Sequence, residues 1–255
     1  MSTRTLKFTI QYDGTDYVGW QRQPNGTSIQ GVLEDALAPI EGTPTTIHGA
    51  GRTDAGVHAL GQVASATVVN TLDERTLARA LNAVLPADVR VLAVEEAAPD
   101  FHARFGARAK TYEYRIVNAP ITSVFLRRYV WHVPQPLDFE AIKTAAGPLV
   151  GTHDFAGFQG TGTYQTSTVR TIQALDVEDG GGFDLPFVIR ITGDGFLRHM
   201  VRNIVGTLVD VGMRRWAPEA VAGILASRDR ARAGRTAPAH GLFLVAVRYG
   251  APDAL

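Results

Sequence analysis

The order of strand and helix patterns in the first hundred residues restricts the fold more than any other feature of this sequence. Residues 5–12 alternate between apolar and polar side chains, which is typical of a strand with one buried face. Apolar residues at helical spacing follow at 29–40, with Ser28 as the expected N-cap. The chain therefore begins with a strand and a helix, joined by a loop that contains glycine and proline.

Two further strands, a second helix and a fourth strand follow in the same region. The two strands are expected within 45–69, on either side of a loop at 49–61 that is too rich in glycine and polar groups to lie inside an element. A helix starting near residues 71–73 buries the apolar positions of 77–85, and 89–94 forms the next strand. This β-α-β-β-α-β order predicts a split β-α-β arrangement, an antiparallel sheet with both helices on one face.

A second α+β unit is expected after Pro99. Its strands are predicted at 111–117, 168–177, 187–192 and 242–249, and its helices at 139–146, 196–211 and 217–225. We expect a boundary within 98–106, and we divide the chain into an N-terminal domain (1–103) and a C-terminal domain (104–255). The C-terminal domain then contains a long amphipathic, arginine-rich helix and the last strand.

Composition excludes several kinds of site. The 255 residues include no cysteine, so a disulfide framework, a thiolate nucleophile and a cysteine-based metal centre are ruled out. The seven histidines show no spacing that requires a metal.

No run of eighteen apolar residues and no signal-peptide pattern is present, so we expect a cytoplasmic protein without a membrane segment.

Charge is balanced overall but unevenly distributed. The chain has 25 basic and 25 acidic residues, yet residues 198–235 contain eight arginines against three acidic residues, and 104–128 are also basic. Such segments can contact RNA phosphates. A solvated helix face rich in arginine is an equally good explanation. The arginines of the first segment are Arg198, Arg202, Arg214, Arg215, Arg228, Arg230, Arg232 and Arg235.

Residues 49–58, Gly-Ala-Gly-Arg-Thr-Asp-Ala-Gly-Val-His, form the segment best suited to chemistry. Small residues surround Arg52, Thr53, Asp54 and His58, so a bulky ligand can approach the backbone closely, and Arg52 can hold a nearby carboxylate ionised. An ordinary turn in which Asp54 caps its own backbone is the main alternative. A phosphate-binding loop is weaker, because neither the Rossmann nor the P-loop pattern is present.

Residues 51–59 resemble the signature of the tRNA pseudouridine synthase A family. Seven further segments resemble that family in the same order, so the match spans nearly the whole chain. They are 12–15 with 19–21, 81–82 with 85–86, 101–105, Tyr112 with Tyr114, 153–155, 196–197 with 199–206, and 237–238 with 241–242.

The resemblance implies isomerisation of uridine to pseudouridine in the anticodon stem-loop of tRNA, at tRNA positions 38–40, without a cofactor or a metal. It also implies two RRM-like or ferredoxin-like α+β halves with mostly antiparallel sheets, an active-site cleft between them, and a homodimer. Asp54 is then the nucleophile. A carboxylate can attack C1' of the ribose, add to C6 of the base, or remove a proton at C2', and the sequence leaves all three open.

The same resemblance implies roles for three further residues. Tyr112 would lie against the target base, although a half-buried strand aromatic is the alternative. Arg202 would pair with Asp54 and keep it ionised, and we expect it on one helix face with Arg198, four residues earlier. Leu242 would pack beneath the base, although an ordinary core leucine is the alternative. Arg198 departs from the family pattern, and we expect it to contact the RNA because it lies in the basic segment.

The role of Arg52 is the most open. It is expected to bind the substrate, by contacting phosphate or by wedging into the RNA as the nucleotide leaves its stack; bracing the loop is the alternative. His58 has a suitable pKa for acid-base catalysis. We nevertheless interpret it as a structural hydrogen-bonding residue.

Two other functions compete with the synthase. A non-catalytic RNA-binding module on two RRM-like sheets would carry the RNP aromatic pattern, which we do not find. A hydrolase would combine Asp54 with a second carboxylate, and no other acidic residue lies in a comparably distinctive segment.

Overall fold

The computed structural model describes residues 3–162, 166–180 and 185–250, which divide into two compact units. Unit 1 comprises the chain up to Arg108 and the segment that begins at Phe243, and unit 2 is Ala109–Leu242. The division lies near the boundary we expected, but the last strand, which we placed in the C-terminal domain, falls almost entirely in unit 1. The reason is that β10 (Leu242–Tyr249) pairs in parallel with β3 (His58–Val68).

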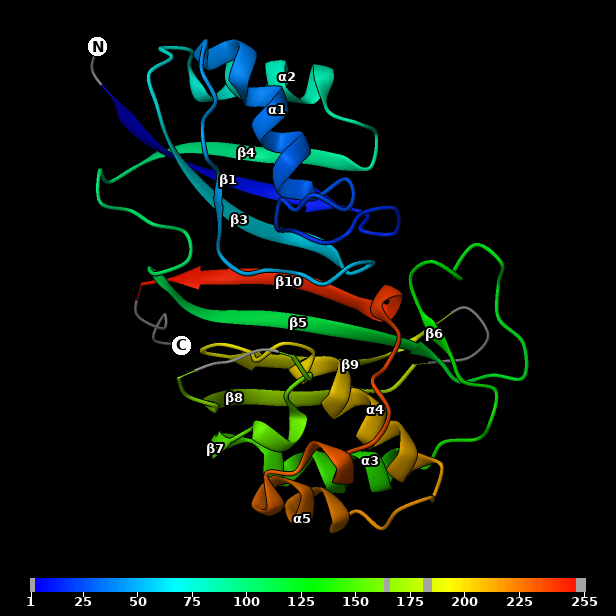
Figure 1. The fold of residues 1–255 in the computed structure, drawn as a ribbon. Coiled ribbons are helices and arrows are strands. Elements are labelled where there is room, and N and C mark those ends of the chain that lie inside the picture. The colour runs from blue at the N-terminus through cyan, green and yellow to red at the C-terminus, as the bar shows by residue number, and fades with distance from the viewer. Residues whose placement is uncertain (1–2, 163–165, 181–184, 251–255) are drawn as a thin grey trace. The chain divides into compact units, whose positions relative to one another are not determined.

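The sheet of unit 1 has the split β-α-β arrangement. β1 (Arg4–Tyr12) lies between β4 (Val89–Ala97) and β3 and is antiparallel to both (Figure 1). The short β2 (His48–Gly49) is antiparallel to β3. The helices are α1 (Ile29–Glu41) and α2 (Glu74–Val84). The predicted element order is confirmed.

Local sequence explains these elements. The apolar residues of β1, from Leu6 to Tyr12, are at most 2% exposed, as the alternation requires. The hydroxyl of Ser28 accepts a hydrogen bond from Gly31 N and caps α1, and the carboxylate of Asp73 caps α2 in the same way. α1 contacts α2, and α2 packs along β4.

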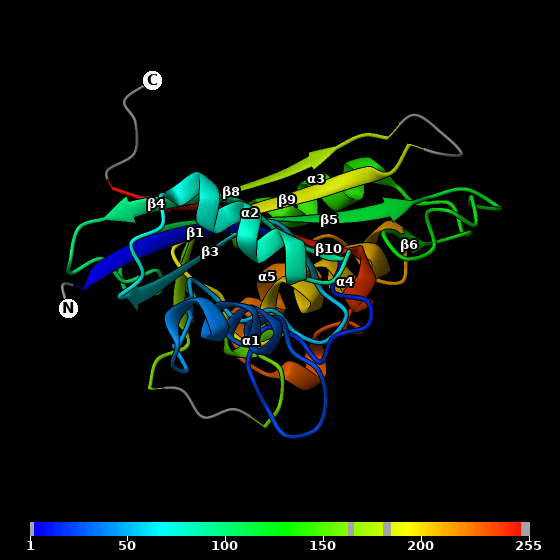
Figure 2. The ribbon, with the colours of Figure 1, turned by 90° about the horizontal axis from the view of Figure 1, so that it is seen from above.

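Unit 2 is also α+β with a mostly antiparallel sheet. Its strands follow the order β5 (Ala107–Val117), β9 (Phe187–Gly193), β8 (Val169–Glu178) and β7 (Gly151–Asp154), as Figure 1 shows. Figure 2 shows from above that β9 lies between β8 and β5. Neighbours in this order are antiparallel, whereas β6 (Trp131–His132) pairs with β5 in parallel. The predicted strands are confirmed. β6 and β7 were not predicted, because they are too short to show an alternation.

Three helices of unit 2 pack together. α3 (Phe139–Ala146) contacts both α4 (Met200–Gly212) and α5 (Ala220–Ser227). Asp138 caps α3 by accepting a hydrogen bond from Ala141 N. Short 3-10 turns complete the described elements, at Gly147–Leu149, Ala156–Phe158, Arg230–Arg232 and Ala239–Gly241.

The start and character of α4 differ from the prediction. The helix begins at Met200 instead of residue 196, because His199 has a left-handed backbone with φ of 59°. Arg198 therefore precedes the helix, and our expectation that it shares a helix face with Arg202 is wrong. All thirteen residues of α4 are described, and every one except Arg202 is buried, so the helix is a core element and not an amphipathic surface helix.

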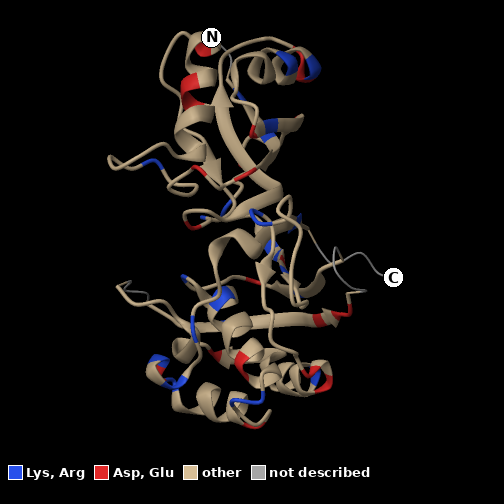
Figure 3. Ribbon diagram, turned by 90° about the vertical axis from the view of Figure 1, so that its right-hand side faces the viewer, with Lys and Arg blue, Asp and Glu red and all other residues tan. Residues whose placement is uncertain are grey.

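The predicted arginine-rich helix is also wrong. Arg202 is the single arginine within α4, and the other arginines of 198–235 precede or follow this helix in the chain. Arg215 and Arg235 both contact the buried carboxylate of Asp210, at 2.8 and 2.9 Å. These arginines hold loops onto the helix instead of forming a solvated helix face. Figure 3 shows that basic and acidic residues occur side by side in both units.

Within the described ranges, no helix combines the length and the apolar character needed to cross a bilayer.

Candidate active site

The loop that carries Asp54 joins β2 to β3 in unit 1, and its backbone is held at several points. Ala50 N donates to Val63 O at 2.7 Å. The fully buried Gln62 donates from Nε2 to Gly51 O at 2.8 Å. Val57 N donates to Asp54 O at 3.1 Å and closes a turn. The loop therefore has one well-defined path between two strands of the same sheet.

Side chains alternate between core and surface along this loop. Thr53 and Val57 are 6% and 1% exposed, whereas Arg52 is exposed and Asp54 is half-buried. Anchoring by Thr53 and Val57 holds the intervening residues in place, so the loop presents Asp54 on a rigid support.

A segment near the N-terminus forms the support beneath the loop. The hydroxyls of Tyr12 and Thr53 are 2.8 Å apart, and Trp20 N donates to Thr53 O at 3.1 Å. Gly56 N donates to Tyr17 O at 3.4 Å. This explains why residues 12–15 and 19–21 accompany the Asp54 loop in the resemblance, a relation that the sequence alone did not reveal.

Two glycines of this support touch the loop backbone. A Cβ atom added at Gly14 would lie 2.0 Å from Val57 O. At Gly19, where φ is +105°, it would lie 2.5 Å from Thr53 O and 3.1 Å from the carbonyl carbon of Asp54. Glycine is required at both positions because the two backbones are in direct contact.

Replacement of Gly19 by alanine is expected to displace the Asp54 loop. The left-handed backbone and the contact with Thr53 O should together cost about 3 kcal/mol of unfolding free energy and lower turnover. Gly42→Ala is the matched control, since Gly42 has φ of +70° and no atom within 4 Å of an added Cβ. Urea unfolding and a turnover assay measure both effects; equal losses in the two variants would contradict the steric explanation.

Tyr12 acts as a neutral hydrogen-bonding residue beneath the loop. Burial raises its pKa to about 12, and the hydrogen bonds with Thr53 and Gln62 only partly oppose this shift. The phenol is therefore protonated at neutral pH, so Tyr12 holds the loop and is not a general base.

His58 is buried at the start of β3, with 1% of its surface exposed. Its Nδ1 lies 3.0 Å from Gly14 N and 3.1 Å from Oδ1 of Asp13, and its ring stacks on Phe243 with centroids 4.7 Å apart. These contacts fit our interpretation of His58 as a structural residue, because they connect β3 to the supporting segment and to β10.

Unit 2 contains the other predicted site residues. Tyr112 on β5 is 7% exposed, lies opposite Ile191 of β9 and meets the ring of Phe196 edge-on at 5.1 Å. Leu242 is 5% exposed at the start of β10. Arg198 is exposed and donates from Nη1 to Thr161 O at 3.0 Å. Tyr112 is therefore a largely buried strand residue with one aromatic neighbour at its edge.

Arg202 lies in the first turn of α4 and is half-buried. Its Nε donates to Ala237 O at 2.7 Å, and Ala237 N donates back to Arg202 O at 3.0 Å. The guanidinium is thus attached to a neighbouring chain segment through Nε, which sets the direction of its planar group.

The segment that holds Arg202, residues 233–238, is itself attached along α4. Asn203 Oδ1 accepts hydrogen bonds from Arg230 Nη2 at 3.0 Å and from Thr236 Oγ1 at 2.6 Å. A Cβ at Gly206 would lie 1.8 Å from Arg235 O, so this segment rests directly on the helix. We did not predict roles for Asn203 and Gly206. The sequence feature that could have indicated them is their position within 199–206, one of the segments in which the chain resembles the family.

Tyr114, the second tyrosine of the Tyr112 pair, is a core residue. It is fully buried, and its hydroxyl donates to Pro238 O at 2.7 Å. Burial raises its pKa, and the charge of Arg202 opposes the shift. This residue attaches β5 to the segment that holds Arg202.

The structure therefore groups the predicted site residues by unit. Arg52 and Asp54 belong to unit 1, and Tyr112, Arg198, Arg202 and Leu242 belong to unit 2. The pairing of Asp54 with Arg202, the stacking role of Tyr112 and the cleft between the halves remain predictions.

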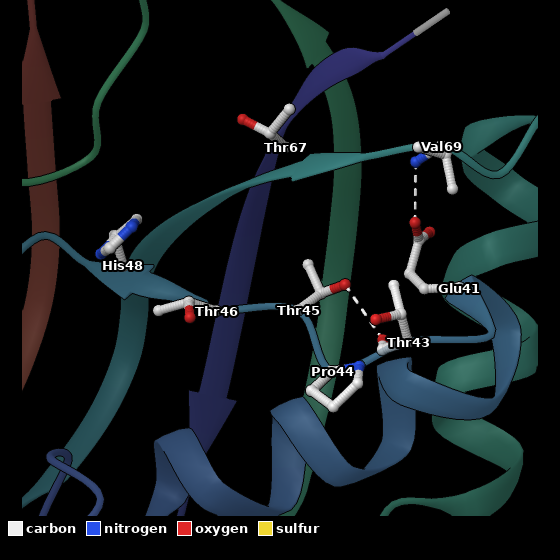
Figure 4. A pocket seen from close by; sticks show the side chains of 8 residues that line it. All are labelled: Glu41, Thr43, Pro44, Thr45, Thr46, His48, Thr67 and Val69. Atoms are coloured by element: carbon white, nitrogen blue, oxygen red, sulfur yellow. Dashed lines mark hydrogen bonds between the residues drawn. The ribbon is translucent and has the colours of Figure 1, made fainter. Parts of the chain in front are cut away.

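A surface hollow of about 370 Å³ lies elsewhere in unit 1 (Figure 4). Its described lining runs from Glu41 and Thr43 at the end of α1, through Thr46 and His48, to Val69. The carboxylate of Glu41 accepts a hydrogen bond from Val69 N at 2.7 Å. Four of its eight lining residues are threonines, and Asp54 is not among them, so the hollow does not suggest a reaction centre.

In the described part of the chain, no group of three or more histidine or carboxylate side chains is arranged to hold a metal ion.

Comparison with known proteins identifies extensive similarity. A family model described as tRNA pseudouridine synthase matches residues 9–106 and 145–250. Proteins named tRNA pseudouridine synthase A are similar along nearly their whole length. The one from Pelobacter propionicus is 46% identical over 96% of this chain and 100% of the relative. Those from Moorella thermoacetica and Solidesulfovibrio magneticus are 48% and 49% identical, over 96% and 97% of this chain and 99% and 92% of the relatives.

Proposed function

The chain belongs to the tRNA pseudouridine synthase A family and is an isomerase that converts uridine to pseudouridine in tRNA, and we propose that Asp54 is its nucleophile. One observation carries the proposal: the loop presents a half-buried carboxylate on a backbone that is anchored to Gln62, to Trp20 and within its own turn. A nucleophile requires this kind of rigid support, because small displacements lower the rate strongly.

The reaction explains why a carboxylate is needed. The C1'–N1 bond of uridine breaks, the uracil turns within the site, C5 bonds to C1', and the proton on C5 is released. Asp54 serves this sequence by attack on C1', by addition to C6, or by proton removal at C2'. In each case the carboxylate must be ionised when the base is bound.

We assign supporting roles to the predicted residues of unit 2. Arg202, oriented by its bond to Ala237 O, pairs with Asp54 and keeps it ionised where the base excludes water. Tyr112 lies against the target base and assists proton removal from C5, and Leu242 packs beneath the ring. These roles require the two units to form one cleft.

RNA contacts are assigned to the two exposed arginines. Arg52 lies two residues before Asp54 on the loop and is exposed, which suits contact with the backbone of the flipped nucleotide or insertion into the stack that it leaves. Arg198 is also exposed and lies just before α4, where it contacts a more distant phosphate.

The substrate region is proposed to be the anticodon stem-loop, at tRNA positions 38–40. Extruding a uridine costs a few kcal/mol and is cheapest in loops and at stem ends, which favours this region. We further propose that the enzyme is a cytoplasmic homodimer. The lack of cysteine is compatible with a reducing compartment, and the dimer is proposed from the family resemblance.

Release of tritium from tRNA labelled at C5 of uridine tests the activity and its position. Wild-type protein should release tritium from unmodified tRNA and should lose this release when uridines 38–40 are replaced by cytidine. Release that persists after the replacement would contradict the proposed position. Tight tRNA binding without any release would favour the RNA-binding module instead.

A further inference from the structure

A stack of aromatic side chains stands on the surface of unit 1, outside the residues assigned to the reaction. The rings of His48 and His102 stack with centroids 4.9 Å apart, and the ring of Phe105 lies 4.4 Å from that of His102. The guanidinium of Arg104 lies 5.7 Å from the Phe105 ring centroid. We call these four residues the Phe105 stack. Phe105 ends it and is 77% exposed.

The exposure of Phe105 does not result from a loose loop. Ala103 is fully buried; its N–H donates to Ser65 Oγ at 3.0 Å, and its carbonyl accepts from Tyr249 Oη at 2.7 Å. Ala103 thus attaches the turn to β3 and β10. The protein holds a large apolar ring in water on a rigid base, an arrangement that usually marks a binding surface.

Hydrogen bonds also set the direction of the middle ring. Nδ1 of His102 accepts from Arg104 N at 3.1 Å and from Phe105 N at 3.4 Å, so the proton of the neutral imidazole lies on Nε2. Burial, followed by the charges of His48 and Arg104, lowers the pKa of His102. The ring is therefore neutral at physiological pH and stacks with His48 without a charge of its own.

The Phe105 stack is connected directly to the Asp54 loop. His48 projects from β2 (Figure 4), and the chain continues from β2 into the loop. Arg52 is four residues further along, which limits the separation of the two Cα atoms to about 14 Å. An RNA segment of a few nucleotides that reaches Arg52 can therefore also reach the stack.

We propose that the Phe105 stack binds an unpaired base of the tRNA substrate, with the exposed face of Phe105 against the base and Arg104 beside the neighbouring phosphate. Aromatic rings next to arginine are the usual platform for unpaired RNA bases, since every base has a flat face and every nucleotide a negative charge. The proposal depends on tRNA as the substrate and does not depend on the role of Asp54.

Equilibrium binding of unmodified tRNA to Phe105 variants tests this site. Phe105→Ala should raise the Kd about 5- to 100-fold, and Phe105→Leu should bind almost as weakly, because leucine is apolar but cannot stack. Phe105→Trp should bind within about two-fold of wild type and show a change in tryptophan emission on binding that wild type lacks. Val84→Ala, at another exposed apolar residue of unit 1, should bind like wild type.

Three results would overturn the proposal. They are an unchanged Kd for Phe105→Ala, full recovery of binding by leucine, and a change of oligomeric state without a change in tRNA affinity. The last result would identify a second copy of the chain as the occupant. Turnover at saturating tRNA separates this site from the reaction, because Phe105→Ala should keep the wild-type kcat. The Asp54 assignment is tested by the kcat of the Asp54 variants and not by the Kd of the Phe105 variants, so the two proposals can fail independently.

Discussion

Replacement of Asp54 by asparagine is expected to lower pseudouridine formation by about 10⁴-fold or more, with tRNA affinity close to wild type. Asparagine has the shape of aspartate, but its amide is a poor nucleophile. Hydrogen bonds of its backbone and of the Thr53 and Gln62 side chains hold the loop, so it should keep its path. The loss should therefore appear in kcat.

Tritium release and tRNA binding, measured on the same preparations, check this result. Asp54→Ala accompanies the asparagine variant, because alanine cannot regain a carboxylate by deamidation. Asp100→Asn removes an exposed carboxylate of the same unit and should retain full activity. Turnover at the wild-type rate in both Asp54 variants would show that another residue is the nucleophile.

Replacement of Arg202 by alanine is expected to lower kcat by about 10²- to 10³-fold with a modest change in tRNA affinity. The variant removes the proposed charge partner of Asp54 and the Nε contact with Ala237 O. Arg202→Lys should recover only part of the rate, because lysine keeps the charge but lacks the planar group that Ala237 orients.

Arg232→Ala is the matched control for this arginine. Arg232 is exposed and lies in the 3-10 turn just before the segment that holds Arg202, so its loss changes the net charge equally and should leave kcat unchanged. Thermal unfolding of all three variants separates misfolding from a defect in the reaction. A defect in tRNA binding alone would show that Arg202 is an RNA contact and not a partner of Asp54.

Elements with strong local signals were predictable from the sequence. The helix at Phe139–Ala146 and the strand at Leu242–Tyr249 have the predicted limits. The predicted N-cap Ser28 makes its expected hydrogen bond, and Asp73, where the second helix was expected to start, caps α2. Periodicity and capping depend on residues within a few positions of one another, so a single sequence contains the information.

The start of α4 was not predictable in this way. Residues 196–199 continue a helical pattern, but the left-handed backbone of His199 places them outside the helix. Gly160 N donates to Arg198 O at 2.7 Å, and this contact with a segment far away in the chain gives the Arg198 carbonyl a partner outside the helix. Tertiary contacts of this kind override a local preference and leave no periodic signal.

For the candidate site, the sequence is enough to predict which groups react: a carboxylate among small residues at 49–58, within segments that resemble one family. The tertiary structure decided what supports Asp54. Tyr12 and Thr53 meet although they are 41 positions apart, and Gly19 touches the backbone of the loop. Such contacts depend on strand register and loop path, which form only when the sheet assembles, so no local pattern can encode them.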